Sequence, residues 1–191
     1  MEKYKYLKDY LEESAAIAKD QIGLFDEFIE IAKLCKSGIL NGNAIFFCGN
    51  GGSAADSQHL AAELIGRFKK DRDPIKAIAL TTDTSIITAI SNDFSFEEVF
   101  TKQLEGLSSS GDILISISTS GESSSILNVS NYAKSNGLKT VAFTNNENNS
   151  LVNICDYKLQ IPSNETGIVQ QGHITFGQLL CYYLETELYP D

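Results

Sequence analysis

A short apolar run, Ala44 to Phe47, passes directly into a glycine-rich loop and then into an amphipathic helix. The loop reads CGNGGS over 48–53, and the helical stretch continues to Phe68. Glycine allows backbone N–H groups to approach a ligand closely, and the start of a helix attracts anions. A strand, a loop and a helix in this order are typical of parallel α/β sheets, and they predict a polar ligand cradle where the helix begins.

The rest of the chain repeats this alternation of short apolar strands and helices. We expect strands over 44–48, 77–80, 113–117, 140–144 and 157–161. We expect helices over 53–68, 84–90, 96–107, 123–134 and 166–188, and a turn over 145–149. Such alternation predicts an α/β fold, with a parallel sheet covered by helices on both faces. Because no linker or internal repeat interrupts the pattern, we expect a single domain over 1–191.

The N-terminal segment has a different pattern. From about Lys3 to Cys35, apolar residues recur at mixed spacings of three and four, which predicts helix. Several turns are apolar on more than one side, so this helix must bury more than one face. Two short helices joined near Gly23 fit the pattern nearly as well. We expect 1–38 to form an oligomerisation segment of one or two helices, and 39–191 to form the α/β core.

Charge and hydropathy narrow the classes of partner. A net charge of −10 argues against a nucleic-acid-binding surface. No apolar run approaches the ~20 residues of a membrane span, and the charged N-terminus lacks the apolar centre of a signal peptide. We therefore expect a cytoplasmic protein with no nucleic acid or membrane partner. Four basic residues lie at or just beyond the end of the first glycine-loop helix, and we interpret them as a solvated helix end: Arg67, Lys69, Lys70 and Arg72.

The cysteines do not have the spacing of a metal or redox motif. Each lies within or beside an apolar segment, so buried free thiols in a reducing compartment are expected. The four are Cys35, Cys48, Cys155 and Cys181.

A second polar loop follows the strand expected over 113–117. It reads STSGES over 118–123 and leads into a helix. Hydroxyls and free N–H groups at such a turn suit a phosphate, although serine and threonine are also ordinary helix caps. With the first loop present, phosphate binding is the better interpretation, and we expect Glu122 to point away from the anion. Loops 49–53, 81–83 and 118–123 all follow strands, so they should meet at one edge of the sheet.

The helix after the first loop carries His59 and Glu63, which share a face at i and i+4. Interconversion of an aldose and a ketose through an enediol needs a base and a group that stabilises an oxyanion, and Glu63 is the best-placed candidate base. A solvated carboxylate and a hydrogen-bonded structural histidine are the alternatives. The pair could also ligate a metal such as zinc, but two ligands do not make a site. Polar loop residues available to hold sugar hydroxyls are Asn50, Ser53, Asn92 and Asp93.

Four blocks together resemble the SIS (sugar isomerase) domain family, and most closely its phosphoheptose isomerase branch. They are CGNGGSAADSQHLAAELIGRF, TTDTSIITAISNDFSFEEVF, ISTSGESSSILN and IPSNETGIVQQGHITFGQLL. The resemblance covers nearly the whole chain. It implies conversion of sedoheptulose 7-phosphate to an aldoheptose 7-phosphate for bacterial lipopolysaccharide or capsule. It also implies a homotetramer and, in some members, zinc.

The resemblance further assigns residues to roles. Glu63 matches the catalytic base, and position 178 matches a catalytic histidine. The positions matching zinc ligands are His59, Glu63, Gln170 and Gln178. The positions matching the sugar phosphate site are Asn50, Gly51, Gly52, Ser53, Asp93, Ser118, Thr119, Ser120 and Ser123. We add Asn92 and Gln170 as further candidates for substrate binding.

One position departs from the family pattern. The last helix of the family resembles IQExHxxxxH, and here the final histidine is replaced by Gln178, while His173 matches the first. Glutamine can donate a hydrogen bond to an oxyanion, but it cannot titrate near neutral pH. His173 lies about 140° around an ideal helix from Gln178, so it cannot take its place. The alternative to an isomerase is therefore a non-catalytic relative that binds a sugar phosphate or a protein partner such as the replication initiator.

Overall fold

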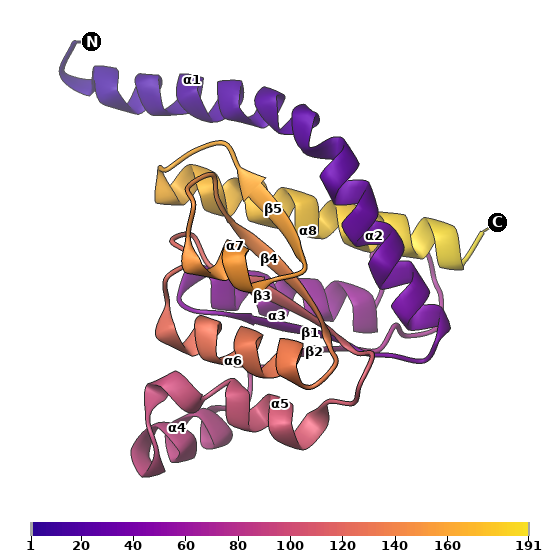
Figure 1. The fold of residues 1–191 in the computed structure, drawn as a ribbon. Helices are drawn as coiled ribbons and strands as arrows, with labels where there is room; N and C mark the ends of the chain where they lie inside the picture. Colours follow the sequence, from indigo (N-terminus) through magenta and orange to yellow (C-terminus); the bar gives the residue numbers. More distant parts are fainter. Residues whose placement is uncertain (1, 191) are drawn as a thin grey trace.

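The computed structural model describes residues 2–190 and forms one parallel five-stranded sheet, in the order β2-β1-β3-β4-β5 (Figure 1). The strands are β1 (Ile45–Gly49), β2 (Ala77–Ala79), β3 (Ile113–Ile117), β4 (Lys139–Asn145) and β5 (Tyr157–Ile161). The α-helices are α1 (Lys5–Asp20), α2 (Phe25–Leu40), α3 (Gly52–Ile65), α4 (Thr84–Asp93), α5 (Thr101–Leu107), α6 (Ser124–Ser135), α7 (Ser150–Ile154) and α8 (Thr166–Leu188). Short 3₁₀ turns occupy Glu2–Tyr4, Gln21–Leu24 and Phe96–Glu98.

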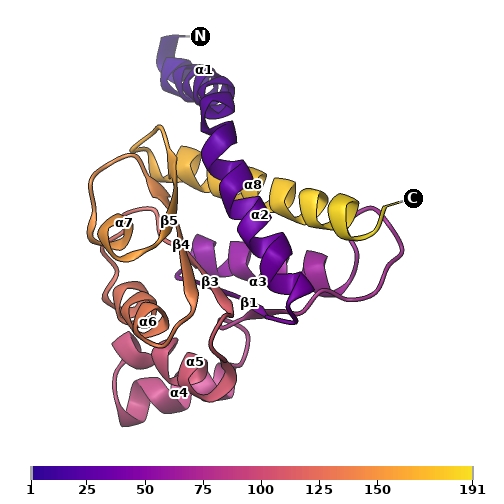
Figure 2. The ribbon, with the colours of Figure 1, turned by 45° about the vertical axis from the view of Figure 1, so that its right-hand side comes forward.

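Helices cover both faces of the sheet, as predicted. Helices α2, α3 and α8 pack on one face, and α5, α6 and α7 pack on the other with α4 beyond them (Figures 1 and 2). Strand β1 shows how the sequence supplies both layers. Its residues are all buried, with Ile45 and Phe47 facing the first layer and Phe46 and Cys48 the second. A strand buried on both sides reads as a continuous apolar run rather than as an alternation.

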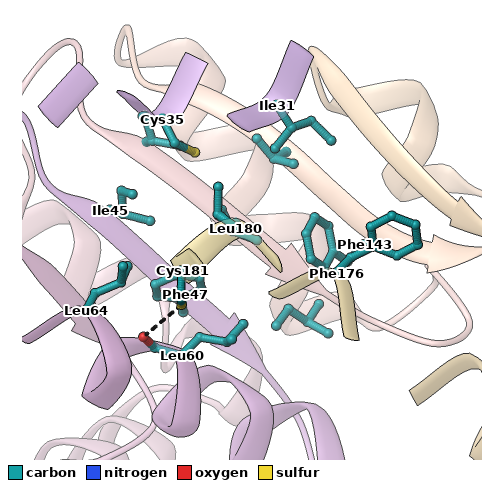
Figure 3. Packing of buried hydrophobic residues seen from close by; sticks show 14 of the residues in the cluster. Ile31, Cys35, Ile45, Phe47, Leu60, Leu64, Phe143, Phe176, Leu180 and Cys181 are labelled. Carbon is teal, nitrogen blue, oxygen red and sulfur yellow. Dashed lines mark hydrogen bonds between the residues drawn. The ribbon is translucent and has the colours of Figure 1, made fainter. Parts of the chain in front are cut away.

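The larger core lies between the sheet and helices α2, α3 and α8 (Figure 3). Phe28 of α2 and Phe176 of α8 pack with ring centroids 5.5 Å apart. Gly177 brings α8 close to α3, because a Cβ at this position would lie 2.5 Å from Leu60. The last helix is therefore held firmly against the helix that follows the glycine loop.

The N-terminal segment forms two helices rather than one. A 3₁₀ turn containing Gly23 separates α1 from α2, so the second of the two sequence interpretations is correct. Helix α2 buries Phe28, Ile31 and Cys35 in the core, whereas α1 buries no residue in the single chain. Figure 1 shows α1 extending beyond the body of the domain. Its exposed apolar side chains include Tyr6, Leu7 and Leu11.

Several boundaries differ from the sequence prediction. Helix α3 ends at Ile65 instead of Phe68, and the stretch expected as helix over 96–107 is a 3₁₀ turn followed by α5. Helix α7 was not predicted. It begins after Asn149, whose side chain accepts a hydrogen bond from the N–H of Val152. Helix α4 extends to Asp93, so Asn92 and Asp93 lie in a helix end and not in a loop.

Two further predictions concern membranes and thiols. Within residues 2–190, no helix combines the length and the apolar character needed to cross a bilayer.

All four cysteines are free; three are fully buried, and Cys155 is partly buried. Burial raises the pKa of the Cys48 thiol to about 12 and that of Cys155 to about 11, so both stay protonated at neutral pH. The prediction of free and largely buried thiols is confirmed.

Candidate functional site: a phosphate pocket and an acid–base cluster

The glycine loop takes a conformation that requires glycine at Gly49 and Gly51, and a side chain at Gly52 would displace Gln170. Gly51, directly before α3, has φ of +55°, which other residues rarely adopt. A Cβ on Gly49 would lie 2.6 Å from the backbone oxygen of Ser53, and one on Gly52 would lie 2.5 Å from Nε2 of Gln170. The loop therefore turns tightly, and it admits the side chain of Gln170 from α8 against the start of α3.

The two polar loops predicted from the sequence meet at the carboxyl edge of the sheet. They enclose a pocket of about 160 Å³ at the start of helices α3 and α6. The pocket is lined by Asn50, Ser53, Ile117, Ser118, Thr119, Ser120, Ser123, Ile126 and Gln170. Seven of the eleven residues expected to bind the sugar phosphate line it; Gly51 and Gly52 belong to the loop that forms its edge.

Hydrogen bonds connect the two loops across the pocket. The side-chain amide of Asn50 donates to the hydroxyls of Ser123 at 2.8 Å and Ser125 at 3.0 Å. The hydroxyl of Ser118 accepts the N–H of Gly121 at 3.1 Å, which shapes the turn. Since Asn50 and Ser123 lie 73 residues apart, these bonds hold the glycine loop and the serine loop in one arrangement.

Glu122 points away from the pocket, as expected. Its carboxylate accepts the N–H and the hydroxyl of Ser150, each at 2.7 Å. These two bonds hold the pKa of Glu122 below its usual value. The one carboxylate in the serine loop is therefore bound to Ser150, outside the pocket, and it does not repel an anion there.

The pocket lining carries no charged side chain. Its donors are hydroxyls, amides and the N–H groups of the first turn of α6, which begins at Ser124. The first N–H groups of a helix lack intrahelical partners, and together with the helix dipole they favour a bound anion. The pocket therefore suits a phosphate held by neutral donors.

A second group of polar side chains lies further along α3. The Nε2 atom of His59 is 3.1 Å from Oε1 of Glu63 and 3.4 Å from Nε2 of Gln178 on α8. The side chains of His59 and Glu63 are 46% and 25% exposed, so both remain accessible to a ligand. The structure thus brings together three of the residues predicted to act in catalysis or metal binding. A carboxylate base and an amide donor both lie within reach of the same imidazole nitrogen.

Gln170 does not join this cluster within one chain. Its side chain lies against Gly52 and lines the phosphate pocket, eight residues before Gln178 on the same helix. The expected metal set is therefore divided: His59 and Glu63 are zinc-type ligands, Gln178 offers only an amide oxygen, and Gln170 is elsewhere. Among residues 2–190, no three His, Cys, Asp or Glu side chains gather as a metal site would require. The residues of one chain do not fit a complete zinc site.

His173 lies in the core and not in the site. It is fully buried, and its ring packs 6.1 Å from that of Phe143. Burial lowers its pKa to about 4, which the backbone of Thr144 only partly opposes. Neither ring nitrogen forms a hydrogen bond of good geometry. His173 is therefore a neutral core residue at physiological pH and cannot replace the histidine missing at position 178.

Asn92 and Asp93 are also separate from the pocket in the single chain. Both are exposed at the end of α4, where the Asn92 amide donates to the Asp93 carboxylate at 2.8 Å. Neither residue lines the pocket formed by the two loops. Among residues 2–190, no hydrogen bond connects them to the residues that line this pocket.

Three polar residues of the region were missed or misread in the sequence. Ser125 joins the Asn50 network, and its position two residues after Ser123 was a usable signal. Arg72 is not a solvated helix-end residue: its side chain is 1% exposed and pairs with Glu185, also 1% exposed. Nothing local in the sequence marks this pair, because its two members are separated by over one hundred residues.

Comparisons with known proteins agree with this geometry. Residues 8–145 match the SIS domain family. The chain is 43% identical over 182 residues to the phosphoheptose isomerase of Aliarcobacter butzleri, covering 95% of this chain and 96% of the relative. It is 46% identical over 160 residues to that of Akkermansia muciniphila, covering 84% and 85%.

Solved structures give the same result. A phosphoheptose isomerase from Francisella tularensis superposes with a TM-score of 0.93 at 31% identity, covering 97% of this chain and 100% of that one. The phosphoheptose isomerase of Neisseria gonorrhoeae gives 0.89 at 33% identity, covering 95% and 98%. Identity of this extent over almost the full length of both chains shows that the chain belongs to the SIS domain family and to its phosphoheptose isomerase branch.

Proposed function

We propose that this protein is a phosphoheptose isomerase that converts D-sedoheptulose 7-phosphate to D-glycero-D-manno-heptose 7-phosphate. The observation that carries the proposal is the position of Glu63, which lies beside His59 and Gln178 in a chain that also has a phosphate-type pocket. Relatives at 43% and 46% identity are phosphoheptose isomerases. The phosphate-type pocket, the candidate base Glu63 and the similarity to phosphoheptose isomerases therefore all favour the same reaction.

The reaction needs one base and one stabilised oxygen. In the proposed mechanism the serine loop holds the phosphate, and the Glu63 carboxylate removes a proton from C1 of the ketose. The electron pair forms a C1–C2 double bond, and O2 takes up a proton from water to give an enediol. Return of the proton from Glu63 to C2, with loss of the O1 proton, gives the aldose. The Gln178 amide donates a hydrogen bond to the oxygen on which negative charge develops.

Gln178 limits the rate of this mechanism. An amide stabilises an oxyanion by hydrogen bonding, but it does not deliver a proton near neutral pH. Loss of a general acid typically costs a factor of about 10²–10⁴ in rate. We therefore propose an isomerase that retains its base and its phosphate pocket and turns over more slowly than relatives with a histidine at this position.

The complete site is proposed to form between subunits of a homotetramer, as the family resemblance implies. Gly52 and Glu63 are eleven residues apart on α3, or about 16 Å along the axis. Gln170 and Gln178 are about 12 Å apart along α8 by the same measure. Each chain thus carries its phosphate pocket and its acid–base cluster at separate places. Leu179 and Tyr182, which share a surface pocket with Gln178, are exposed apolar side chains that a second subunit would cover.

Mixed oligomers test this arrangement. Subunits carrying Glu63→Gln and subunits carrying Ser118→Ala with Ser120→Ala are each expected to be inactive or nearly so. If one site uses Glu63 from one subunit and the serine loop of another, mixing and reassembly restores part of the activity. A lack of any recovery in confirmed mixed oligomers contradicts the shared site.

Zinc is a separate element of the proposal. His59 and Glu63 would provide two ligands, with Gln178 from the same chain and Gln170 from another as amide oxygens. Calorimetry with zinc alone, on the wild type and on His59→Ala, tests binding without reference to activity. The mechanism given above routes no step through the metal.

We also propose the setting of the reaction. Heptose phosphates of this kind supply bacterial surface glycans such as lipopolysaccharide or capsule, whose precursors are made in the cytoplasm. Growth of a heptose-deficient bacterium complemented by this gene is the corresponding test.

Turnover is the direct test of the function. Phosphorus and proton NMR of purified protein with sedoheptulose 7-phosphate, with and without zinc, should show formation of the aldoheptose 7-phosphate. The Gln178 substitution favours one alternative, a non-catalytic protein that binds the sugar phosphate. Tight binding with no turnover under either condition would replace the isomerase by that alternative.

A further inference from the structure

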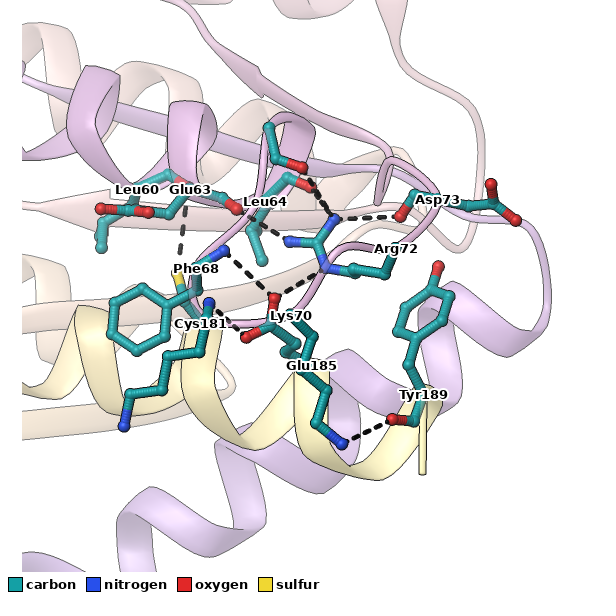
Figure 4. Close-up of polar contacts among 12 residues, drawn as sticks. Leu60, Glu63, Leu64, Phe68, Lys70, Arg72, Asp73, Cys181, Glu185 and Tyr189 are labelled. Atoms are coloured by element: carbon teal, nitrogen blue, oxygen red, sulfur yellow. Dashed lines mark hydrogen bonds and ion pairs between the residues drawn. The ribbon is translucent and has the colours of Figure 1, made fainter. Parts of the chain in front are cut away.

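The connection from α3 to β2 contains a buried cation. Residues 66–76 have no regular secondary structure, yet the Arg72 side chain in their middle is only 1% exposed. Its guanidinium donates to the backbone oxygens of Glu63 and Leu64, both at 2.8 Å, and to that of Asp73 at 3.0 Å (Figure 4). The last carbonyls of a helix have no intrahelical partner and attract positive charge. Arg72 therefore caps the C-terminal end of α3, at the residue that carries the proposed base.

The same guanidinium is connected to α8. Its Nε lies 3.3 Å from Oε1 of Glu185, whose side chain is likewise 1% exposed. Glu185 also accepts the N–H groups of Phe68 at 3.1 Å and Lys69 at 2.6 Å. Burial opposes the ionisation of Glu185, but these N–H groups and Arg72 outweigh it and lower its pKa. The carboxylate is thus charged and binds both the arginine and the chain that leads to it.

Glu185 lies on the same face of α8 as Gln178. The two are seven residues apart, which is two turns of an α-helix. Between them, the thiol of Cys181 lies 3.9 Å from the backbone oxygen of Leu60 on α3 (Figures 3 and 4). The contacts between α3 and α8 therefore run in order from His59 and Gln178, through Leu60 and Cys181, to the Arg72–Glu185 pair.

We infer that the Arg72–Glu185 ion pair is a positioning device that sets the register of α3 against α8, and so holds Glu63 and Gln178 at their working separation. The inference rests on the proposed isomerase function. Apolar contacts such as Leu60 with Gly177 bring the two helices together, but they tolerate sliding. A buried ion pair whose members also form directed hydrogen bonds to the backbone favours one register, a role that buried polar groups have in some systems. A misplacement of about 1 Å at reacting groups can cost about 10²-fold in rate.

The test replaces both charges at once. Removing one partner leaves a buried charge without compensation and destabilises the fold, whereas an apolar pair of similar size is often tolerated. We expect Arg72→Met with Glu185→Leu to remain folded, with the wild-type oligomeric state. Its kcat should fall about 10- to 100-fold, with an unchanged Kd for sedoheptulose 7-phosphate, because the phosphate pocket is at the far end of both helices. Wild-type kcat in the folded double variant overturns the inference.

A matched control uses another ion pair on the same helix. Lys36 on α2 and Glu187 on α8, two residues beyond Glu185, are 2.8 Å apart, so this pair joins α8 to α2. Lys36→Met with Glu187→Leu should leave kcat unchanged. If the Arg72–Glu185 double variant does not fold, Arg72→Lys keeps the charge but loses the planar fork that spans two carbonyls. Its kcat should be reduced at unchanged Kd, and a wild-type kcat again overturns the inference.

A failure of the proposed function would be recognised separately. If the wild type shows no turnover, crystal structures of the wild type and the folded double variant still test whether the Arg72–Glu185 pair positions α3 against α8. We expect the 3.4 Å contact between His59 and Gln178 to be lost in the variant and kept in the control. Its retention in the double variant overturns the positioning role, whatever the protein catalyses.

Discussion

The Nε2 atoms of His59 and Gln178 lie 3.4 Å apart, although 119 residues separate the two in the chain. The contact joins the helix that follows the glycine loop to the last helix, beside the carboxylate of Glu63. The family pattern that this chain resembles has a histidine where Gln178 stands here. The amide at this position contacts the imidazole of His59 but cannot titrate near neutral pH.

Restoring a histidine should therefore raise the rate. Gln178→His places an imidazole beside His59 and Glu63, where it can donate a proton near neutral pH. We expect kcat for sedoheptulose 7-phosphate to increase about 10- to 100-fold, within the range that general acids contribute. Steady-state kinetics measure the effect. Gln171→His, which adds an imidazole to an exposed position of the same helix, is the control and should change nothing. A rate for Gln178→His at or below wild type would remove position 178 from proton transfer.

The serine loop should determine phosphate affinity. Ser118→Ala and Ser120→Ala each remove a hydroxyl from the pocket, and a lost hydrogen bond to a charged group costs about 1.5–3 kcal/mol. Calorimetry with sedoheptulose 7-phosphate should show this weakening, with little change in Tm. Ser135→Ala, at the exposed far end of α6, should bind like the wild type. Unchanged affinity in both loop variants would mean that the phosphate binds elsewhere.

His173 should make the fold sensitive to acid. Its pKa is about 4 when folded and 6.5 by reference when unfolded, so the unfolded chain binds the proton more tightly. The contribution of neutral His173 to stability is complete above about pH 6.5, and it is lost as the pH falls towards 4. The total is on the order of 3 kcal/mol. His173→Leu, which leaves no new polar group unpaired, should make the free energy of unfolding less dependent on pH between these values. If the free energy of unfolding of variant and wild type depends on pH in the same way across this range, His173 is not the group responsible.

Helix α1 should belong to a subunit interface. It buries no residue in the single chain, and Leu7 and Leu11 are 53% and 68% exposed. An apolar face of this kind is typical of an interface. Light scattering should give a homo-oligomer, with the tetramer as the expected size. Leu7→Lys with Leu11→Lys should give smaller species of unchanged secondary structure. A wild-type monomer at micromolar concentration would refute this prediction.

The layered α/β fold could be predicted because its signals are local. Strands β3 and β5 were predicted to the residue, since each is a short run bounded by polar or turn residues. Helix α8 was also predicted with its observed ends. Helix α7 was missed because five residues after an asparagine-rich turn look like a loop. Only the cap at Asn149 marks its start.

The site could be predicted only in part, for a related physical reason. The serine and glycine loops are adjacent because strands β1 and β3 are neighbours, which the order of a parallel sheet makes foreseeable. The contact between His59 and Gln178 depends on how α3 packs against α8, and no local pattern specifies it. Arg72 appeared solvated beside other basic residues, and its burial depends on Glu185 far along the chain.

The most direct test concerns Glu63 as the base that moves the proton between C1 and C2. The measurement is turnover of sedoheptulose 7-phosphate by Glu63→Gln and by the wild type at one zinc concentration, with Kd determined for both. Glutamine has nearly the same shape as glutamate but cannot accept the proton. We predict turnover by the wild type and none above background by Glu63→Gln, which should still bind the sugar phosphate through the distant serine loop. Turnover by Glu63→Gln at the wild-type rate would contradict the account.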